Sequence, residues 1–225
     1  MFDTQLSDAD NFDLGSISFK DPEDISFTDN AFRKIKIYVR NPDGSIGDLV
    51  FSAPRQLFSF GIQELTDGHG NTNGYIMPIS LWKRKEPTPD EEKFIETLNQ
   101  IVGLALEQVH KYVDTSTIDT KRFSPLSFKK HSEREDDRKS PILYTKLIFN
   151  KRDQKISSLF FDEATNTEID PLSILNKKCY VTAAIKIESI FIGDKITLQI
   201  KLYEAIVKVL KQNRRLLTND AATAR

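Results

Sequence analysis

The chain has only one cysteine, one tryptophan and three histidines among its 225 residues, and it has no long apolar run. A single cysteine, Cys179, excludes an internal disulfide and a zinc site built from paired thiolates within one chain. No apolar run approaches the roughly 20 residues that span a bilayer, and the first residues lack the basic-then-apolar pattern of a secretory signal. We therefore expect a soluble, intracellular protein that does not contact a membrane.

Signatures of catalysis and of cofactor binding are also missing. The three histidines have no metal-ligand spacing. The Gly-His-Gly sequence at 68–70 lacks the Lys-Ser/Thr pair of a phosphate-binding loop, and no Gly-x-Ser-x-Gly motif is present. We predict that the protein is not an enzyme and needs no cofactor and no metal. A metal-dependent nuclease that gathers acids from separate strands is the alternative that the sequence leaves open.

Charge is distributed unevenly, although the net charge is only -1. Residues 1–30 contain eight acids and one base, whereas residues 111–155 contain twelve bases and seven acids. A basic segment can attract a polyanion even when the whole chain is near neutral, because the local field governs the encounter. The alternative is a block of solvated charge with no ligand.

Composition and periodicity predict three regions. Residues 1–29 are acidic with scattered phenylalanines, and we expect a mostly disordered arm. Residues 30–210 are expected to form a single binding domain, and residues 211–225 a basic, flexible tail. Apolar and polar residues alternate over 31–40, which is typical of a strand, and a long hairpin is expected over 179–209.

The sequence Thr-Pro-Asp-Glu at 88–91 is the strongest local helix signal. The threonine suits the N-cap, the proline suits the first helical position, and the glutamate completes a capping box. Helical spacing of apolar residues then predicts one helix over about 89–113, followed by a basic loop over 114–140.

About seven strands with one long helix indicate a mainly β (α+β) protein, and we expect an OB-like barrel with a helical insertion and extra strands. A sandwich would have the same strand count.

The functional prediction depends on the polar faces of the expected strands. Each of these faces combines a tyrosine with a lysine: Tyr38 with Lys36, Tyr144 with Lys146, Tyr180 with Lys186, and Tyr203 with Lys201. Unpaired bases stack on aromatic rings for about 1–3 kcal/mol each, and their phosphates attract basic side chains. Since a duplex hides its base faces, such a surface favours single strands. The alternative is that tyrosine and lysine are simply common on half-exposed strands.

Basic residues beside aromatic ones at 82–85 and in the loop 121–130 extend this pattern. In the Phe-Ser-Phe-Gly sequence at 58–61 we expect Phe58 in the core and leave Phe60 open. The predicted DNA-binding residues are Lys34, Lys36, Tyr38, Arg40, Trp82, Lys83, Arg84, Lys121, Arg122, Phe123, Lys129, Lys130, Tyr144, Lys146, Lys151, Arg152, Tyr180, Lys186, Lys201 and Tyr203.

Several short motifs carry a family resemblance. They are the sequence 58–64 after Pro54, the sequence 74–82, the Pro-Thr pair at 87–88 that opens the helix, and Tyr-x-Lys-Leu at 144–147. Over roughly residues 30–210 the chain resembles an OB-fold single-stranded DNA-binding protein family of nucleocytoplasmic large DNA viruses, of the African swine fever virus type. The resemblance implies a protein that coats exposed strands during viral DNA replication, repair or recombination. It also implies location at the viral replication site in the host cell cytoplasm, with the virion as a second location.

We therefore predict a single-stranded DNA-binding protein without strong sequence preference. RNA is a second candidate ligand, and replication proteins are candidate partners. The alternative function is a structural or adaptor protein that binds another protein through the acidic, phenylalanine-bearing arm. The same arm could instead mimic DNA and cover the basic groove in the free state.

Overall fold

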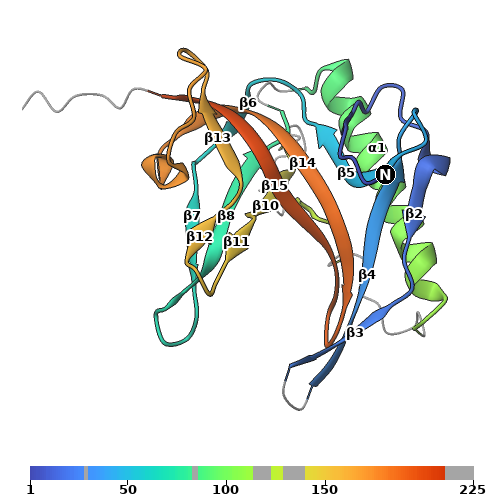
Figure 1. Cartoon of the computed structure of the whole chain (residues 1–225). Helices are drawn as coiled ribbons and strands as arrows, with labels where there is room; N and C mark the ends of the chain where they lie inside the picture. The colour runs from blue at the N-terminus through green and yellow to red at the C-terminus, as the bar shows by residue number, and fades with distance from the viewer. Residues whose placement is uncertain (28–29, 83–85, 114–122, 129–139, 211–225) are drawn as a thin grey trace, which may run out of the picture.

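The structure of the protein is a computed structural model, and it describes residues 1–27, 30–82, 86–113, 123–128 and 140–210. The long β14–β15 hairpin crosses the middle of the molecule, with α1, β4 and β5 on one side and β7, β8 and β10–β12 on the other (Figure 1). The helices are η1 (Leu14–Ser16), α1 (Pro89–His110) and η3 (Pro171–Ile174). The strands are β1 (Leu6–Ser7), β2 (Ile17–Phe19), β3 (Glu23–Phe27), β4 (Asn30–Arg40), β5 (Ile46–Ser52), β6 (Leu57–Ser59), β7 (Gln63–Thr66), β8 (Thr72–Ser80), β9 (Leu126–Ser127), β10 (Ile142–Leu147), β11 (Phe149–Asn150), β12 (Lys155–Ile156), β13 (Leu159–Asp162), β14 (Cys179–Ile192) and β15 (Ile196–Val209).

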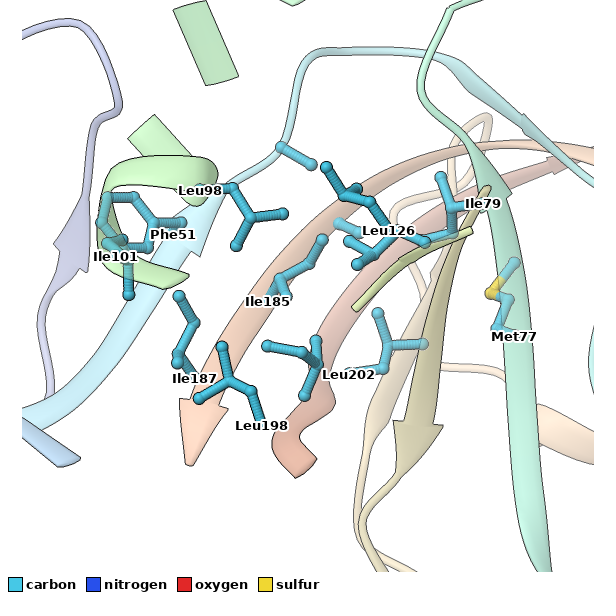
Figure 2. Close-up of a cluster of buried hydrophobic side chains, with 14 of the residues drawn as sticks. Phe51, Met77, Ile79, Leu98, Ile101, Leu126, Ile185, Ile187, Leu198 and Leu202 are labelled. Carbon is cyan, nitrogen blue, oxygen red and sulfur yellow. The ribbon is translucent and has the colours of Figure 1, made fainter. Parts of the chain in front are cut away.

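Helix α1 begins where the sequence predicts. The Thr88 Oγ1 atom accepts a hydrogen bond from the Glu91 N–H (3.3 Å), and the Thr88 N–H donates to Glu91 Oε2 (2.7 Å). This capping box satisfies N–H groups that the start of a helix leaves without partners. The apolar stripe of α1 packs on the sheet, and Figure 2 shows Leu98 and Ile101 lying against Phe51 of β5 and against Ile185 and Ile187 of β14.

The β14–β15 hairpin organises the sheet. Along one edge β14 pairs with β15, and along its other edge it pairs in turn with β6, β5 and β4. Every second residue of β14 from Cys179 to Ile187 is buried on the side that faces α1. The intervening residues therefore lie on the opposite side, because strand side chains alternate. We call this opposite side of the sheet the outer face.

The predicted OB-like barrel is wrong. Within the described residues, thirteen strands form one large mixed sheet that is not closed into a barrel. Three of its pairings, β1–β5, β10–β15 and β13–β15, are parallel. An OB fold is a five-stranded Greek-key barrel, and counting likely strands along the chain does not reveal which strands pair. The mainly β class and the single long helix are confirmed.

The N-terminal residues differ from the disordered arm that we expected. Strands β2 and β3 pair with β4, and β1 pairs with β5. Ala9 is buried, and the Phe12 ring lies 4.6 Å from the Phe51 ring in an edge-to-face contact. Phe12 and Phe19 pack against the core and supply apolar surface that holds this acidic segment on the sheet. Most of the predicted loop 114–140 and the whole tail 211–225 lie outside the described residues.

Candidate nucleic-acid interface

Three lysines lie side by side on the outer face. Lys146 of β10 is the register partner of Lys201 of β15, and Lys201 is the register partner of Lys186 of β14. We call these three residues the lysine row. Like charges directly opposite each other on neighbouring strands destabilise a sheet. Such a row therefore costs stability unless an anion lies over it.

The electrostatics of Lys201 reflect this crowding. Burial lowers the pKa of the Lys201 ammonium group below its ordinary value. The Glu188 carboxylate opposes that change, and three other ammonium groups reinforce it: those of Lys146, Lys34 and Lys186. Four basic side chains from β4, β10, β14 and β15 thus lie within electrostatic reach of one another.

Carboxylates neutralise only part of this positive charge. Three ion pairs form on the outer face: Lys186 with Asp48 (2.7 Å), Lys34 with Glu188 (3.5 Å) and Lys36 with Glu23 (3.0 Å). Lys146 donates to the neutral amide oxygen of Gln199 at 3.1 Å. In the part of the chain that the structure describes, neither Lys146 nor Lys201 forms an ion pair. Within the lysine row, these two ammonium groups are therefore the ones that no carboxylate of the described residues pairs with.

A cleft of about 690 Å³ opens next to the lysine row, towards the tip of the β14–β15 hairpin. Its apolar part contains Phe32 and Phe191, whose ring centroids are 5.2 Å apart, together with Ile25 of β3. Its charged part contains Lys34, Lys146 and Lys195, together with the carboxylates of Glu188 and Asp194. Apolar rings beside ammonium groups suit a nucleotide, which combines a flat base with a charged phosphate.

Two of the predicted tyrosines are exposed near lysines of the row. Tyr144 is 44% exposed and lies two residues before Lys146 on the outer face of β10. Tyr203 is 36% exposed and lies two residues after Lys201 on β15. Both rings have free surface on which a base could stack.

The N-terminal segment covers another predicted residue, Tyr38. The ring of Phe2 meets the Tyr38 ring edge-on with centroids 5.9 Å apart, and the Lys20 Nζ atom lies 5.4 Å from the Tyr38 centroid. Since these contacts already use part of the ring, Tyr38 offers less surface to a base than Tyr144 does. Arg40, also predicted, is exposed at the end of β4.

Several of the remaining predicted residues do not lie at the lysine row. Phe123 is 1% exposed and belongs to the hydrophobic core, so it cannot stack on DNA in this conformation. Trp82 is half-buried and packs against the same core. Lys151 and Arg152 lie in the turn between β11 and β12, where Lys151 donates to Asn73. The remaining predicted residues lie outside the described ones: Lys83, Arg84, Lys121, Arg122, Lys129 and Lys130.

Sequence reasoning missed three aromatic residues of the outer face. Phe32 and Phe191 line the cleft. Phe58, which we expected in the core, is half-buried and has its ring 6.4 Å from that of Tyr180. The signal was present in the alternation of Phe58-Ser59-Phe60, since Ser59 is the fully buried member and the phenylalanines are not.

Two features of other functional classes are absent from the described residues. No helix there is long and apolar enough to cross a membrane. No group of three or more His, Cys, Asp or Glu side chains in that part of the chain is placed to hold a metal ion.

Comparisons with known proteins give relatives in two viruses. Over 174 residues the chain is 26% identical to "Uncharacterized protein 007R" of Invertebrate iridescent virus 3. The matched region is 73% of this chain and 37% of that protein. Over 171 residues it is 26% identical to "Early 31 kDa protein" of Frog virus 3 (isolate Goorha), covering 72% of this chain and 64% of the relative. The chain thus spans less than two thirds of the length of either relative. Both are viral proteins, which is consistent with a viral protein here.

A protein family matches nearly the whole chain, over residues 17–225. The matched range includes β2 to β15, and therefore the lysine row, the cleft and α1. The chain belongs to the family described as "Protein of unknown function (DUF2738)".

Proposed function

We propose that this protein binds single-stranded DNA across the outer face of its sheet, without strong sequence preference, and that it is not an enzyme. The lysine row carries the proposal: three adjacent ammonium groups, two of them without an ion pair among the described residues, are a costly arrangement that phosphates would relieve. Tyr144 and Tyr203 add exposed rings for stacking. The resemblance described above implies a role on exposed strands during viral DNA replication, repair or recombination, and the relatives are viral proteins.

Single strands suit this surface better than duplexes. Stacking on Tyr144 needs an open base face, which a duplex does not offer. RNA is a second candidate ligand, because its unpaired bases and phosphates offer the same stacking and charge contacts. We place the protein at the viral replication site in the host cell cytoplasm, with the virion as a second location and replication proteins as partners.

The adaptor function is less well supported than DNA binding. It requires an acidic arm that presents free phenylalanines, whereas Phe12 and Phe19 pack against the core and only Phe2, among the arm phenylalanines whose side chains are described, is largely exposed. One observation supports the other hypothesis about this arm, in which it mimics DNA and covers the basic groove. Strand β3 places Glu23 against Lys36 and contributes Ile25 to the cleft.

Fluorescence anisotropy tests the proposed function directly. A labelled oligo-dT of about 30 nucleotides should bind the full chain more tightly than the matching duplex, with log K falling by about 0.7 for each neutralised phosphate per tenfold rise in salt. A mixed-sequence single strand should bind with similar affinity. Binding that ignores salt, or that prefers the duplex, would contradict the proposal.

Replacing Glu23 with Gln tests whether β3 competes with DNA. The substitution frees Lys36 from its ion pair and removes a negative charge near the cleft. We expect oligo-dT to bind about two- to threefold more tightly at low salt, because an exposed ion pair is weak and competes only slightly with a phosphate. Glu96→Gln on α1, which also breaks an exposed ion pair with a lysine, is the matched control. Unchanged or weaker binding by Glu23→Gln would show that Glu23 does not compete.

A further inference from the structure

A second aromatic group lies on the outer face, away from the cleft. Phe58 lies between Phe60 and Tyr180, with ring centroids 5.0 Å and 6.4 Å from them and edge-to-face geometry in both pairs. Phe60 is 45% exposed, and the Lys178 Nζ atom lies 6.0 Å from its ring centroid. We call Phe58, Phe60 and Tyr180 the aromatic platform.

The backbone beneath the platform is held in one conformation. Gly61 has a φ of +87°, and a Cβ atom there would lie 2.4 Å from the Lys177 carbonyl oxygen and 2.5 Å from that of Ile174. The Gly61 N–H donates to the buried Ser59 Oγ at 3.1 Å. The Ile62 carbonyl accepts from the Asn176 N–H at 2.8 Å. These contacts hold the backbone on the C-terminal side of Phe60 before any ligand arrives, so little loop ordering remains to oppose binding.

The platform is continuous with the lysine row along one strand. Tyr180 and Lys186 both project from the outer face of β14, six residues apart. At about 3.3 Å per residue this separation is roughly 20 Å, a distance that a few nucleotides can span. Lys208, the register partner of Tyr180, adds a further ammonium group at this end, although it also forms an ion pair with Glu163 (3.2 Å).

We propose that the aromatic platform is a base-stacking subsite, in which an unpaired nucleobase of the bound strand lies on the exposed ring of Phe60. This inference rests on the proposed function and extends it. An exposed phenylalanine held rigidly beside a lysine offers a flat apolar surface for a base and a cation for its phosphate, which is the combination used for single strands. The strand would then run along β14 from the lysine row to Phe60.

The test compares Phe60→Ala with the wild-type chain on two ligands of equal length, oligo-dT and a fully abasic deoxyribose-phosphate chain. We expect Phe60→Ala to bind oligo-dT about tenfold more weakly, because one stacked base contributes about 1–3 kcal/mol. Affinity for the abasic chain should not change, and the salt dependence should stay as in the wild type, since no phosphate contact is lost. Leu159→Ala, which truncates a side chain that is 41% exposed on another strand, is the control.

Three results would overturn this inference. Equal loss on both ligands would mean that Phe60 acts through the fold or through phosphates. No loss on oligo-dT would remove the platform alone and leave the lysine row as the binding site. A wild-type chain that does not bind oligo-dT would remove the platform together with the proposed function. Unfolding in urea distinguishes misfolding from lost stacking, since truncation of an exposed ring should leave the unfolding midpoint almost unchanged.

Discussion

Replacing Lys146 and Lys201 together with glutamine is expected to weaken oligo-dT binding by one to two orders of magnitude at low salt. These two lysines form no ion pair among the described residues, so no paired carboxylate has to be displaced before they meet phosphates. By contrast, Lys186 must share its ammonium group with Asp48 at 2.7 Å. Removing two phosphate contacts should lower the slope of log K against log salt by about 1.4.

The same substitutions should not destabilise the fold. Lys201 loses the cost of burying its charge, and both residues lose the repulsion between register partners. We therefore expect the midpoint of urea unfolding to stay constant or to rise, while binding falls. Residues that serve function at the expense of stability behave in this way.

A double substitution on α1, Lys93→Gln with Lys111→Gln, removes the same charge from the helix on the other side of the sheet. Measured at about 0.15 M salt, where the Debye length is about 8 Å, it should leave oligo-dT affinity within about twofold, because these lysines belong to the helix on the other side of the sheet. If this control weakens binding as much as the double substitution in the lysine row, the protein responds to net charge and the row is not the site. If neither variant changes binding, DNA lies elsewhere.

The local parts of the fold were predictable because they depend on neighbouring residues. The capping box of Thr88 and Glu91 needs only four residues of sequence, and the alternation that predicted β4 and the β14–β15 hairpin is a property of one strand at a time. The same alternation assigned Lys146, Lys186 and Lys201 to polar faces. Their adjacency, however, follows from the parallel pairing of β10 with β15. Register between distant segments leaves no mark in the sequence of either one.

The errors have the same physical origin. Strand count predicted a barrel, but the length of β14 lets β4, β5 and β6 share one of its edges, and this pairing is a long-range property. Acidity predicted a disordered arm, but burial of Ala9 and the contact of Phe12 with Phe51 hold that segment on the sheet. The sequence also did not show whether a single aromatic residue in a polar loop is buried or exposed, and Phe123 is an example. No periodic neighbours indicate which way its ring points.

Phe123→Ala is expected to cost about 3–5 kcal/mol of the free energy of unfolding, the largest stability effect that we predict. The side chain is 1% exposed within the hydrophobic core, and truncating it leaves a cavity that the surrounding residues fill only in part. Since a typical domain is stable by about 5–15 kcal/mol, this variant should unfold at a much lower urea concentration, with the slope unchanged.

The neighbouring Phe128→Ala is the matched control, because Phe128 is 64% exposed and lies in the same described segment. It should change stability by less than about 0.5 kcal/mol. Under conditions where Phe123→Ala remains folded, its affinity for oligo-dT should stay within about twofold of the wild type, because a core ring stacks on no base. If Phe123→Ala instead unfolds at the same urea concentration as the wild type and loses DNA binding, the ring leaves the core to contact DNA, as the sequence alone suggested. A loss of stability without a loss of affinity would assign Phe123 to the scaffold that holds the lysine row in register.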